Sequence, residues 1–262
     1  MRRVQLLGTF FRLGFLGEAE YRANFALHAF ESAVSLATGL TVLSVVFSKT
    51  PSIGGWEWNH LMVVLGLWFL VSGVVNMVVA PSIRQFIHDV WLGNLDFLLV
   101  KPVGHQFMVS TRKIMVFNVV ELFIGTALIA TALVRLGARV GPQEVLQFVL
   151  SISFGAAVLY SFWVVLGTLA LYSGKLENLM LVFYSMFEAG RWPVGLYPLW
   201  LRYSLVFVVP IALAITVPAE ALVGRLPWET VGLAGAYALV SLAFSTWFFR
   251  WSLRHKYMGA SA

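Results

Sequence analysis

The chain has 262 residues, of which 60% are hydrophobic and 11% charged, with a formal net charge of +6. Soluble globular proteins are about 45–50% apolar and about 25% charged, so this composition excludes a single soluble domain and indicates a protein whose solvent is lipid. The sequence contains no cysteine, which excludes disulfide bonds and thiolate metal sites. We attribute the positive charge to Lys and Arg beside membrane spans, and we expect no nucleic-acid partner.

The first 22 residues predict an amphipathic helix that lies on the membrane surface. Leu7, Phe11 and Phe15 fall near one helical face, and Arg12 interrupts the apolar pattern. A secretory signal peptide is the alternative, but its apolar region would be continuous and a small-residue cleavage site would follow. We therefore expect a retained interfacial helix over residues 1–22.

Two apolar segments follow, each long enough to cross a bilayer, which takes about 20 residues of helix. We place the first span at 23–48 and the second at 58–80. The first span carries Asn24, His28 and Glu31 on one narrow face. His28 and Glu31 have the i, i+3 spacing of a carboxylate-bridged metal half-site, but such a site needs more carboxylates at the same depth than this chain offers.

A short amphipathic segment comes after the second span, at 82–94, and we expect it to lie along the membrane. It leads into "GNLDFLLVKPVGHQF", which is too short to cross a bilayer and too apolar for a solvated loop. Its apolar centre and flanking residues are Leu95, Asp96, Phe97, Leu98, Leu99, Lys101 and Pro102. We call residues 95–102 the connector. It either dips into the membrane interface or binds another protein.

Spans three and four are predicted at 114–134 and 145–172. The third span holds Asn118 and Glu121 one turn apart. An ionisable group within a membrane is unfavourable unless it faces protein or water. These side chains, with the polar face of the first span, therefore either hold helices together by hydrogen bonds or line a translocation path or a dimer seam.

The C-terminal third is harder to divide into spans. Residues 176–190 are short for a crossing, and 203–219 is apolar but contains Pro210 and Pro218. A last span follows at 230–249 and ends in a basic tail. One of the two earlier segments must cross for the last span to return to the side of the N-terminus.

Lys and Arg are enriched on the cytoplasmic flanks of spans, so their distribution predicts orientation. If 176–190 crosses and Arg191 falls outside, twelve of the 18 Lys and Arg residues lie on the side of the two termini. If 203–219 crosses instead, fourteen of them do. Both schemes place the termini and the connector in the cytoplasm.

The sequence has no motif for nucleotide binding or hydrolysis, since GxxxxGK[ST], HExxH and GxSxG are all missing. We therefore expect a chain that is not an enzyme and that holds no cofactor or metal of its own.

Four features resemble the permease subunits of ATP-binding-cassette (ABC) exporters of the type-2 permease family. They are the basic N-terminal segment leading into "EYRANFALHAFE", the connector pattern G-x-L-D-x-L-L-x-K-P, the Pro-rich "GRWPVGLYPLWLRYSLVFVVP", and a last span ending in "RWSLRHK". The connector pattern is the most specific, and together the features cover nearly the whole chain. The resemblance implies one permease domain over 1–262, with four spans in 23–172, a cytoplasmic coupling loop at 82–113, and a fifth span, a hairpin re-entrant from the outer face and a sixth span in 173–262.

The resemblance also implies partners. Two copies of a cytosolic ABC ATPase would bind ATP and Mg²⁺ and dock on the connector, and a second permease, identical or homologous, would complete the pathway. We predict an all-α integral protein of the cytoplasmic (inner) membrane, surrounded by lipid, with six transmembrane helices, an N-terminal interfacial helix and a re-entrant hairpin before the last span. Two alternatives stay open, namely an ion-coupled carrier that uses Glu31 and Glu121 as a proton relay, and a membrane scaffold that transports nothing.

Overall fold

The computed structural model describes residues 8–12, 14, 22–96, 100, 104–137, 141–172 and 177–256. Every regular element in these ranges is a helix, and five helices are long and apolar enough to cross a membrane. These five are Ala23–Phe47, Trp58–Trp91, Val116–Leu136, Pro142–Leu171 and Trp228–His255. The prediction of an all-α integral membrane protein is confirmed, and the predicted spans coincide with these helices except that the second continues past its predicted end.

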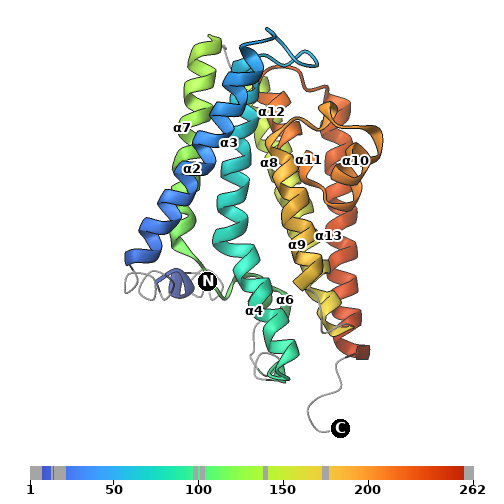
Figure 1. Ribbon diagram of the computed structural model, residues 1–262. Coiled ribbons are helices and arrows are strands. Elements are labelled where there is room, and N and C mark those ends of the chain that lie inside the picture. Colours follow the sequence, from blue (N-terminus) through green and yellow to red (C-terminus); the bar gives the residue numbers. More distant parts are fainter. Residues whose placement is uncertain are drawn as a thin grey trace.

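The helices run up and down in one bundle (Figure 1). α3 (Trp58–Val74) packs mainly against α7 (Val119–Leu136), and α8 (Pro142–Thr168) packs mainly against α13 (Trp228–Lys256). α2 (Arg22–Phe47) lies at the edge, where its membrane segment is 17% buried, whereas that of the helix containing α3 is 61% buried. We call the end at which α2 begins and α13 ends the proximal end, and the opposite end the distal end. α2 is therefore the helix most open to lipid or to a partner.

Glycines allow the closest helix contacts in the bundle. A Cβ atom on Gly125 of α7 would lie 2.5 Å from the carbonyl oxygen of Gly66 on α3. A Cβ atom on Gly155 of α8 would lie 2.5 Å from the carbonyl oxygen of Leu213, in the short helix α11 (Ile211–Ala214). Because lipid is as apolar as the side chains, small residues that let backbones approach are a main source of helix association in membranes.

The second transmembrane helix continues through Pro81 as α4 (Ala80–Trp91), so our prediction of a separate helix along the membrane is wrong. Proline has no amide to bond the carbonyl four residues earlier, which is that of Met77. The Met77 carbonyl oxygen instead accepts from the Met115 amide at 2.8 Å, and a π-helical turn, Val75–Val79, precedes the proline. At 1.5 Å per residue the 34-residue helix is about 51 Å long, so α4 projects beyond a hydrocarbon layer of about 30 Å.

A bent pair of helical segments fills the distal half of the bundle between α9 (Glu177–Glu188) and α13 (Figure 1). Leu199–Val208 and Ile211–Leu222 meet at an angle of 71°. Pro210, which lies between them, cannot donate the hydrogen bond that would continue the helix. This pair occupies the position of the predicted hairpin. α9 has 12 residues and is about 18 Å long, which is too short to cross the membrane alone. If the bent pair is one broken span, the described residues contain six candidate spans.

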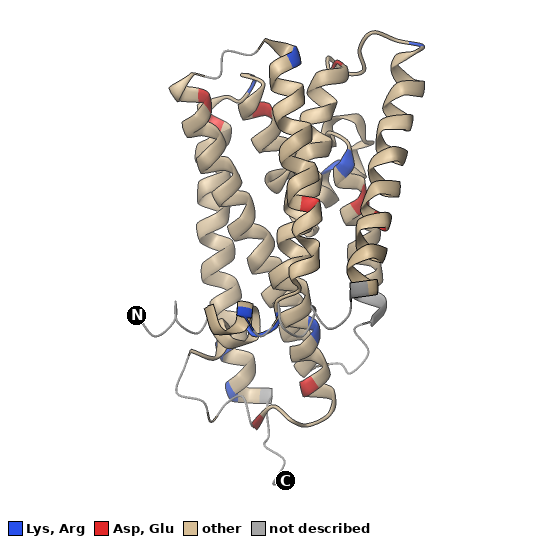
Figure 2. Cartoon of the chain, turned by 90° about the vertical axis from the view of Figure 1, so that its left-hand side faces the viewer, with Lys and Arg blue, Asp and Glu red and all other residues tan. Residues whose placement is uncertain are grey.

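The predicted interfacial helix at 1–22 lies largely outside the described residues. Residues 8–12 and 14 are described, and they are helical. Charged positions occur at the two ends of the bundle and also part-way along it (Figure 2). Those part-way along the bundle form the candidate site.

Candidate intramembrane site

α9 ends part-way through the bundle and not at its distal end. The 3₁₀ turn Ala189–Arg191 follows it, and Trp192 then takes an extended conformation, with φ −121° and ψ 148°. Trp192 precedes Pro193, and the residue before a proline is disfavoured in the helical region. The proline therefore explains why the helix stops here.

The backbone at this break is hydrogen-bonded by side chains from elsewhere. The Phe187 carbonyl oxygen accepts from Trp68 Nε1 of α3 at 3.1 Å. The Ala189 carbonyl oxygen accepts from the Tyr197 hydroxyl at 2.9 Å. Irregular backbone at membrane depth is tolerated where protein satisfies its polar groups in this way. Hydrogen bonds from other parts of the chain therefore stabilise the break after α9.

Arg191 lies at the break and is held by three elements. Its Nε is 2.7 Å from Glu188 Oε2, its Nη2 donates to Ser35 Oγ at 2.9 Å, and its Cζ is 4.1 Å from the ring centre of Trp68. The Arg191 side chain is 19% exposed and that of Glu188 is 54% exposed. A largely buried cation is therefore fixed between α2, α3 and α9, and its carboxylate partner faces outward.

Glu121 brings a second carboxylate to this region from α7. It faces the side chain of Ser72 and interacts electrostatically with His28, Glu188 and Arg191. Its Oε2 atom is buried without a hydrogen-bond partner in the part of the chain that the structure describes. Glu121 therefore lies within electrostatic range of charged groups on both α2 and α9.

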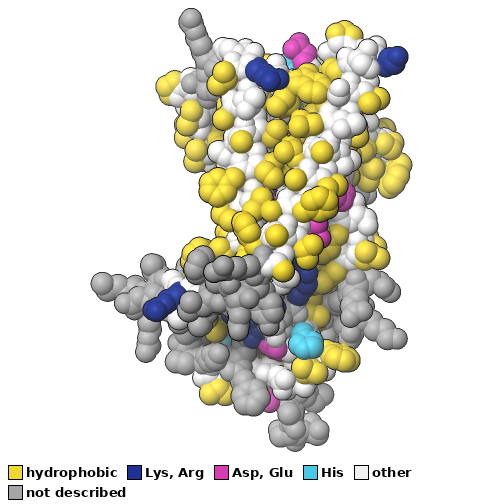
Figure 3. Space-filling model, turned by 60° about the vertical axis from the view of Figure 1, so that its left-hand side comes forward, with side chains coloured by type: hydrophobic (Ala, Val, Ile, Leu, Met, Phe, Trp, Pro, Cys, Tyr) yellow, Lys and Arg dark blue, Asp and Glu magenta, His cyan; other side chains and the backbone are white. Residues whose placement is uncertain are grey.

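The predicted polar face of α2 points out of the chain. The side chain of Glu31 is 72% exposed and that of His28 is 46% exposed, and Glu31 Oε2 lies 3.5 Å from His28 Nδ1. Asn24 is exposed as well. Acidic side chains lie part-way down an otherwise apolar surface in Figure 3. The His28 ring centre also lies 6.3 Å from that of Phe117, so His28 contacts the rest of the chain, whereas Glu31 mainly faces outward.

Asn118 behaves differently, because it joins two helices. It is 8% exposed, and its Nδ2 donates to the backbone carbonyl oxygen of Asn76 at 3.1 Å and to that of Met115 at 3.3 Å. The side-chain amide of Asn76, through Nδ2, in turn donates to Ser72 Oγ at 3.1 Å. Of the two roles that we considered for these polar residues, helix bridging applies to Asn118.

Sequence reasoning missed Glu188, Arg191 and Trp68. It counted Arg191 among the outer cations, and the structure corrects this by placing the guanidinium inside the bundle. The available signal was the i, i+3 spacing of Glu188 and Arg191 at the end of a segment too short to cross. No signal pointed to Trp68, whose hydrogen-bond partner Phe187 is 119 residues away.

α4 is joined to the helix that carries Glu188. Arg84 donates a hydrogen bond to the Tyr184 hydroxyl of α9, and its Cζ lies 5.3 Å from the centre of that ring. Tyr184 and Glu188 are four residues apart and so lie on one face of α9. On the other side of α4, Asp89 forms an ion pair with Arg112. α4 therefore contacts both the segment before α7 and the helix that ends at the charged cluster.

The connector is only partly described. Leu95 is fully buried in the core, Asp96 is half-buried and Val100 is 83% exposed. The remaining predicted coupling residues lie outside the described residues: Phe97, Leu98, Leu99, Lys101 and Pro102. Because Leu95 packs within the chain itself, its side chain is not available to a partner.

Helices of membrane length, with an ion pair held part-way through them, define a multi-pass membrane protein with an internal polar site. A family model described as an ABC-2 family transporter protein matches residues 33–261. The chain therefore belongs to the ABC-2 transporter family, which confirms the resemblance to type-2 permeases and makes the chain a transmembrane permease. No curated protein and no solved structure matches the chain.

Proposed function

We propose that this permease forms half of the translocation pathway of an ATP-driven exporter. The observation that carries the proposal is the outward-facing pair His28 and Glu31 on α2, the helix whose Ser35 bonds Arg191 of the Glu188–Arg191 ion pair. Glu31 is nine residues from the start of α2, or about 14 Å at 1.5 Å per residue, which places it within the hydrocarbon layer.

An exposed carboxylate at that depth is unfavourable in lipid, by about 2.5–3.5 kcal/mol on insertion scales. It therefore needs water or a partner chain. A second permease subunit, identical or homologous, that faces α2 and the end of α9 would enclose a path lined by these groups. The low burial of α2 within a single chain supports such a contact.

Energy would enter at the proximal end, from two copies of a cytosolic ATPase that bind ATP and Mg²⁺. The Lys and Arg distribution supports a cytoplasmic location for this end and for both termini. Docking on the connector would move α4, and the Arg84–Tyr184 contact would carry that movement to α9. The Glu188–Arg191 ion pair, which lies where α9 ends, would then shift with α9.

Affinity purification of the chain from its native membranes tests the partner. We expect an ABC ATPase to co-purify, and we expect Leu98→Asp to release it. Val134→Asp is the control, because Val134 is an 80% exposed apolar residue near the distal end of α7. If no ATPase co-purifies, or if Leu98→Asp retains it as well as Val134→Asp does, the docking proposal is wrong.

A second experiment tests the coupling route. A single cysteine at position 31 in the purified complex should change its reactivity toward a water-soluble thiol reagent when ATP is added. Arg84→Gln should abolish this change while the ATPase stays bound, whereas Arg135→Gln at the distal end should leave it intact. A change that requires a proton gradient and no ATP would instead support an ion-coupled carrier.

A further inference from the structure

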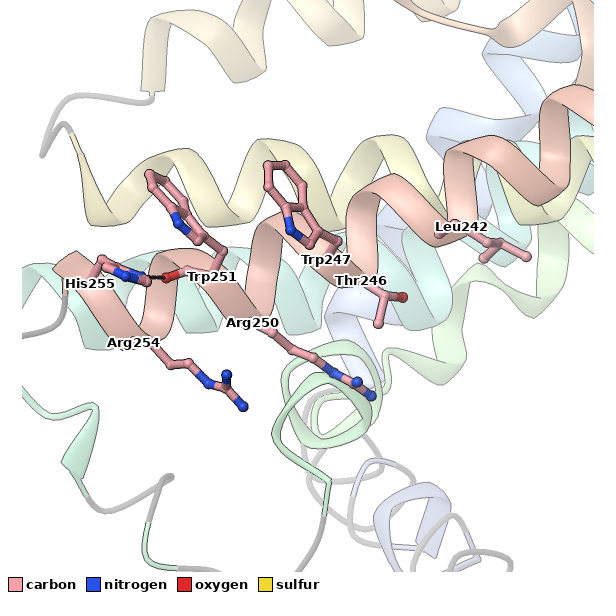
Figure 4. Close-up of a pocket in the computed structure, with 8 residues that line it drawn as sticks. Leu242, Thr246, Trp247, Arg250, Trp251, Arg254 and His255 are labelled. Atoms are coloured by element: carbon pink, nitrogen blue, oxygen red, sulfur yellow. Dashed lines mark hydrogen bonds between the residues drawn. The ribbon is translucent and has the colours of Figure 1, made fainter.

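The proximal part of α13 carries two neighbouring rows of side chains, one basic and one aromatic (Figure 4). Arg250 and Arg254 are one helical turn apart and point to one side. Trp247 and Trp251 point to the other side, with ring centres 6.2 Å apart, and the Trp251 ring centre is 5.1 Å from that of His255. All five side chains are exposed.

These side chains border two hollows that share Arg250. One has a volume of about 590 Å³, and the described residues that line it all belong to α13, between Leu242 and His255. The other has a volume of about 490 Å³ and lies between α13, α8 and α6 (His105–Thr111), with His105 and Tyr160 in its wall. Both hollows are open to the surroundings, so a ligand could reach them from the membrane.

The charge around the hollows is one-sided. Among the residues that the structure describes, no acidic one lines either hollow. Within the described ranges, Arg250 and Arg254 form no ion pair, whereas Arg112 and Arg191 each pair with a carboxylate. His255 Nδ1 donates to the Trp251 carbonyl oxygen at 2.9 Å, which leaves its Nε2 facing away from the helix backbone. Two guanidinium groups are therefore available to an anion.

The depth of this surface matches the headgroup layer of a membrane. Arg250 lies 22 residues after Trp228, the first residue of α13, which corresponds to about 33 Å along the helix. The hydrocarbon core is about 30 Å thick, and Trp side chains gather at its two boundaries. Trp228 and Trp247 thus stand at opposite boundaries, and the arginines lie at headgroup level.

We propose that this surface binds the headgroup of an anionic phospholipid. The phosphate would accept hydrogen bonds from Arg250 and Arg254, since the planar guanidinium matches phosphate geometry. The acyl chains would lie along the apolar face of α13 on the distal side of the arginines, where Leu239, Val240 and Phe244 are 70%, 66% and 51% exposed. Continuity between the basic surface and this apolar face favours a lipid over a soluble phosphate.

The test is native mass spectrometry of the purified chain with phosphatidylglycerol or phosphatidylcholine. Each of Arg250→Gln and Arg254→Gln should weaken phosphatidylglycerol binding about five-fold, and the double variant about 25-fold, from ~1 kcal/mol per basic residue near an anionic surface. Phosphatidylcholine binding should change little. Arg135→Gln, which removes an exposed arginine from the distal end of α7, should leave both lipids unaffected.

Several results would overturn the proposal. One is a double variant that loses phosphatidylglycerol and phosphatidylcholine binding equally. Another is an Arg135→Gln variant that loses as much phosphatidylglycerol binding as the double variant does. Displacement of phosphatidylglycerol by millimolar inorganic phosphate would identify a soluble anion as the ligand. A double variant that binds lipid normally but no longer dimerises would identify the surface as a contact between copies. The substitutions are on exposed side chains, so they should leave the fold intact.

Discussion

Replacing Arg191 by methionine removes the cation at the break after α9 but keeps a long, unbranched apolar side chain. Three contacts are lost, namely the hydrogen bond to Ser35 Oγ at 2.9 Å, the contact with the Trp68 ring at 4.1 Å and the ion pair with Glu188 at 2.7 Å. The Glu188 carboxylate is left in the membrane without its partner. We expect the variant to unfold more readily than the parent chain.

The size of the loss follows from the environment of each contact. A hydrogen bond from a charged group contributes about 1.5–3 kcal/mol. A desolvated cation–π contact contributes up to about 2 kcal/mol, and an ion pair with a half-exposed carboxylate contributes less than about 1 kcal/mol. Because the three contacts share one side chain, their energies do not simply add. We expect the free energy of unfolding to fall by about 3 kcal/mol.

Reversible unfolding in detergent–lipid micelles, followed by tryptophan fluorescence, measures this change. Arg135→Met is the control, since Arg135 is exposed at the distal end of α7 and should change the free energy by no more than about 0.5 kcal/mol. Combining Arg191→Met with Glu188→Gln should recover part of the loss, because the unpaired carboxylate is removed as well. Equal stabilities for Arg191→Met and Arg135→Met would refute the reasoning.

Two further substitutions test the packing around the site in the same unfolding assay. Gly125→Val should destabilise the chain by about 1–3 kcal/mol, because its Cβ would lie 2.5 Å from the Gly66 carbonyl oxygen. An unchanged stability would mean that α3 and α7 are not in backbone contact. Trp68→Phe should lower the free energy of unfolding by about 1–3 kcal/mol, because it leaves the Phe187 carbonyl oxygen unbonded. Trp91→Phe is the control, since Trp91 is 68% exposed and its replacement should have little effect. Equal changes in the two variants would contradict the assigned hydrogen bond.

The number and placement of the long spans could be predicted because membrane thickness sets a length and lipid sets a composition. The end of the second span could not. Pro81 is an ordinary signal for a helix end, and nothing local indicates that the Met115 amide, 38 residues after Met77, bonds the carbonyl that the proline leaves free. A tertiary contact therefore overrides the local signal.

The candidate site could be predicted from the sequence only in part. A polar face on one helix is visible as a spacing, so Asn24, His28 and Glu31 could be found in the sequence. Arg191 could not be placed, because counting charges beside spans assumes that each segment either crosses or stays outside. A helix that stops part-way, with its carbonyl groups bonded by Trp68 and Tyr197, satisfies neither assumption.

The central claim is that the polar face of α2 borders water within the membrane. The chain has no native cysteine, so a single introduced cysteine is the one thiol that can react with the reagent. Glu31 is 72% exposed and Phe30 is 67% exposed, and these adjacent residues lie at nearly the same depth but about 100° apart around the helix. Phe30 is thus a control matched in depth and exposure.

The decisive measurement is the reaction of Glu31→Cys and Phe30→Cys with a membrane-impermeant thiol reagent in intact membrane vesicles. A thiol reacts as its thiolate, which forms in water and not in lipid. We predict that Glu31→Cys is modified and that Phe30→Cys is not. Equal modification of the two positions, or no modification of Glu31→Cys with or without ATP, would contradict a water-filled pathway along α2.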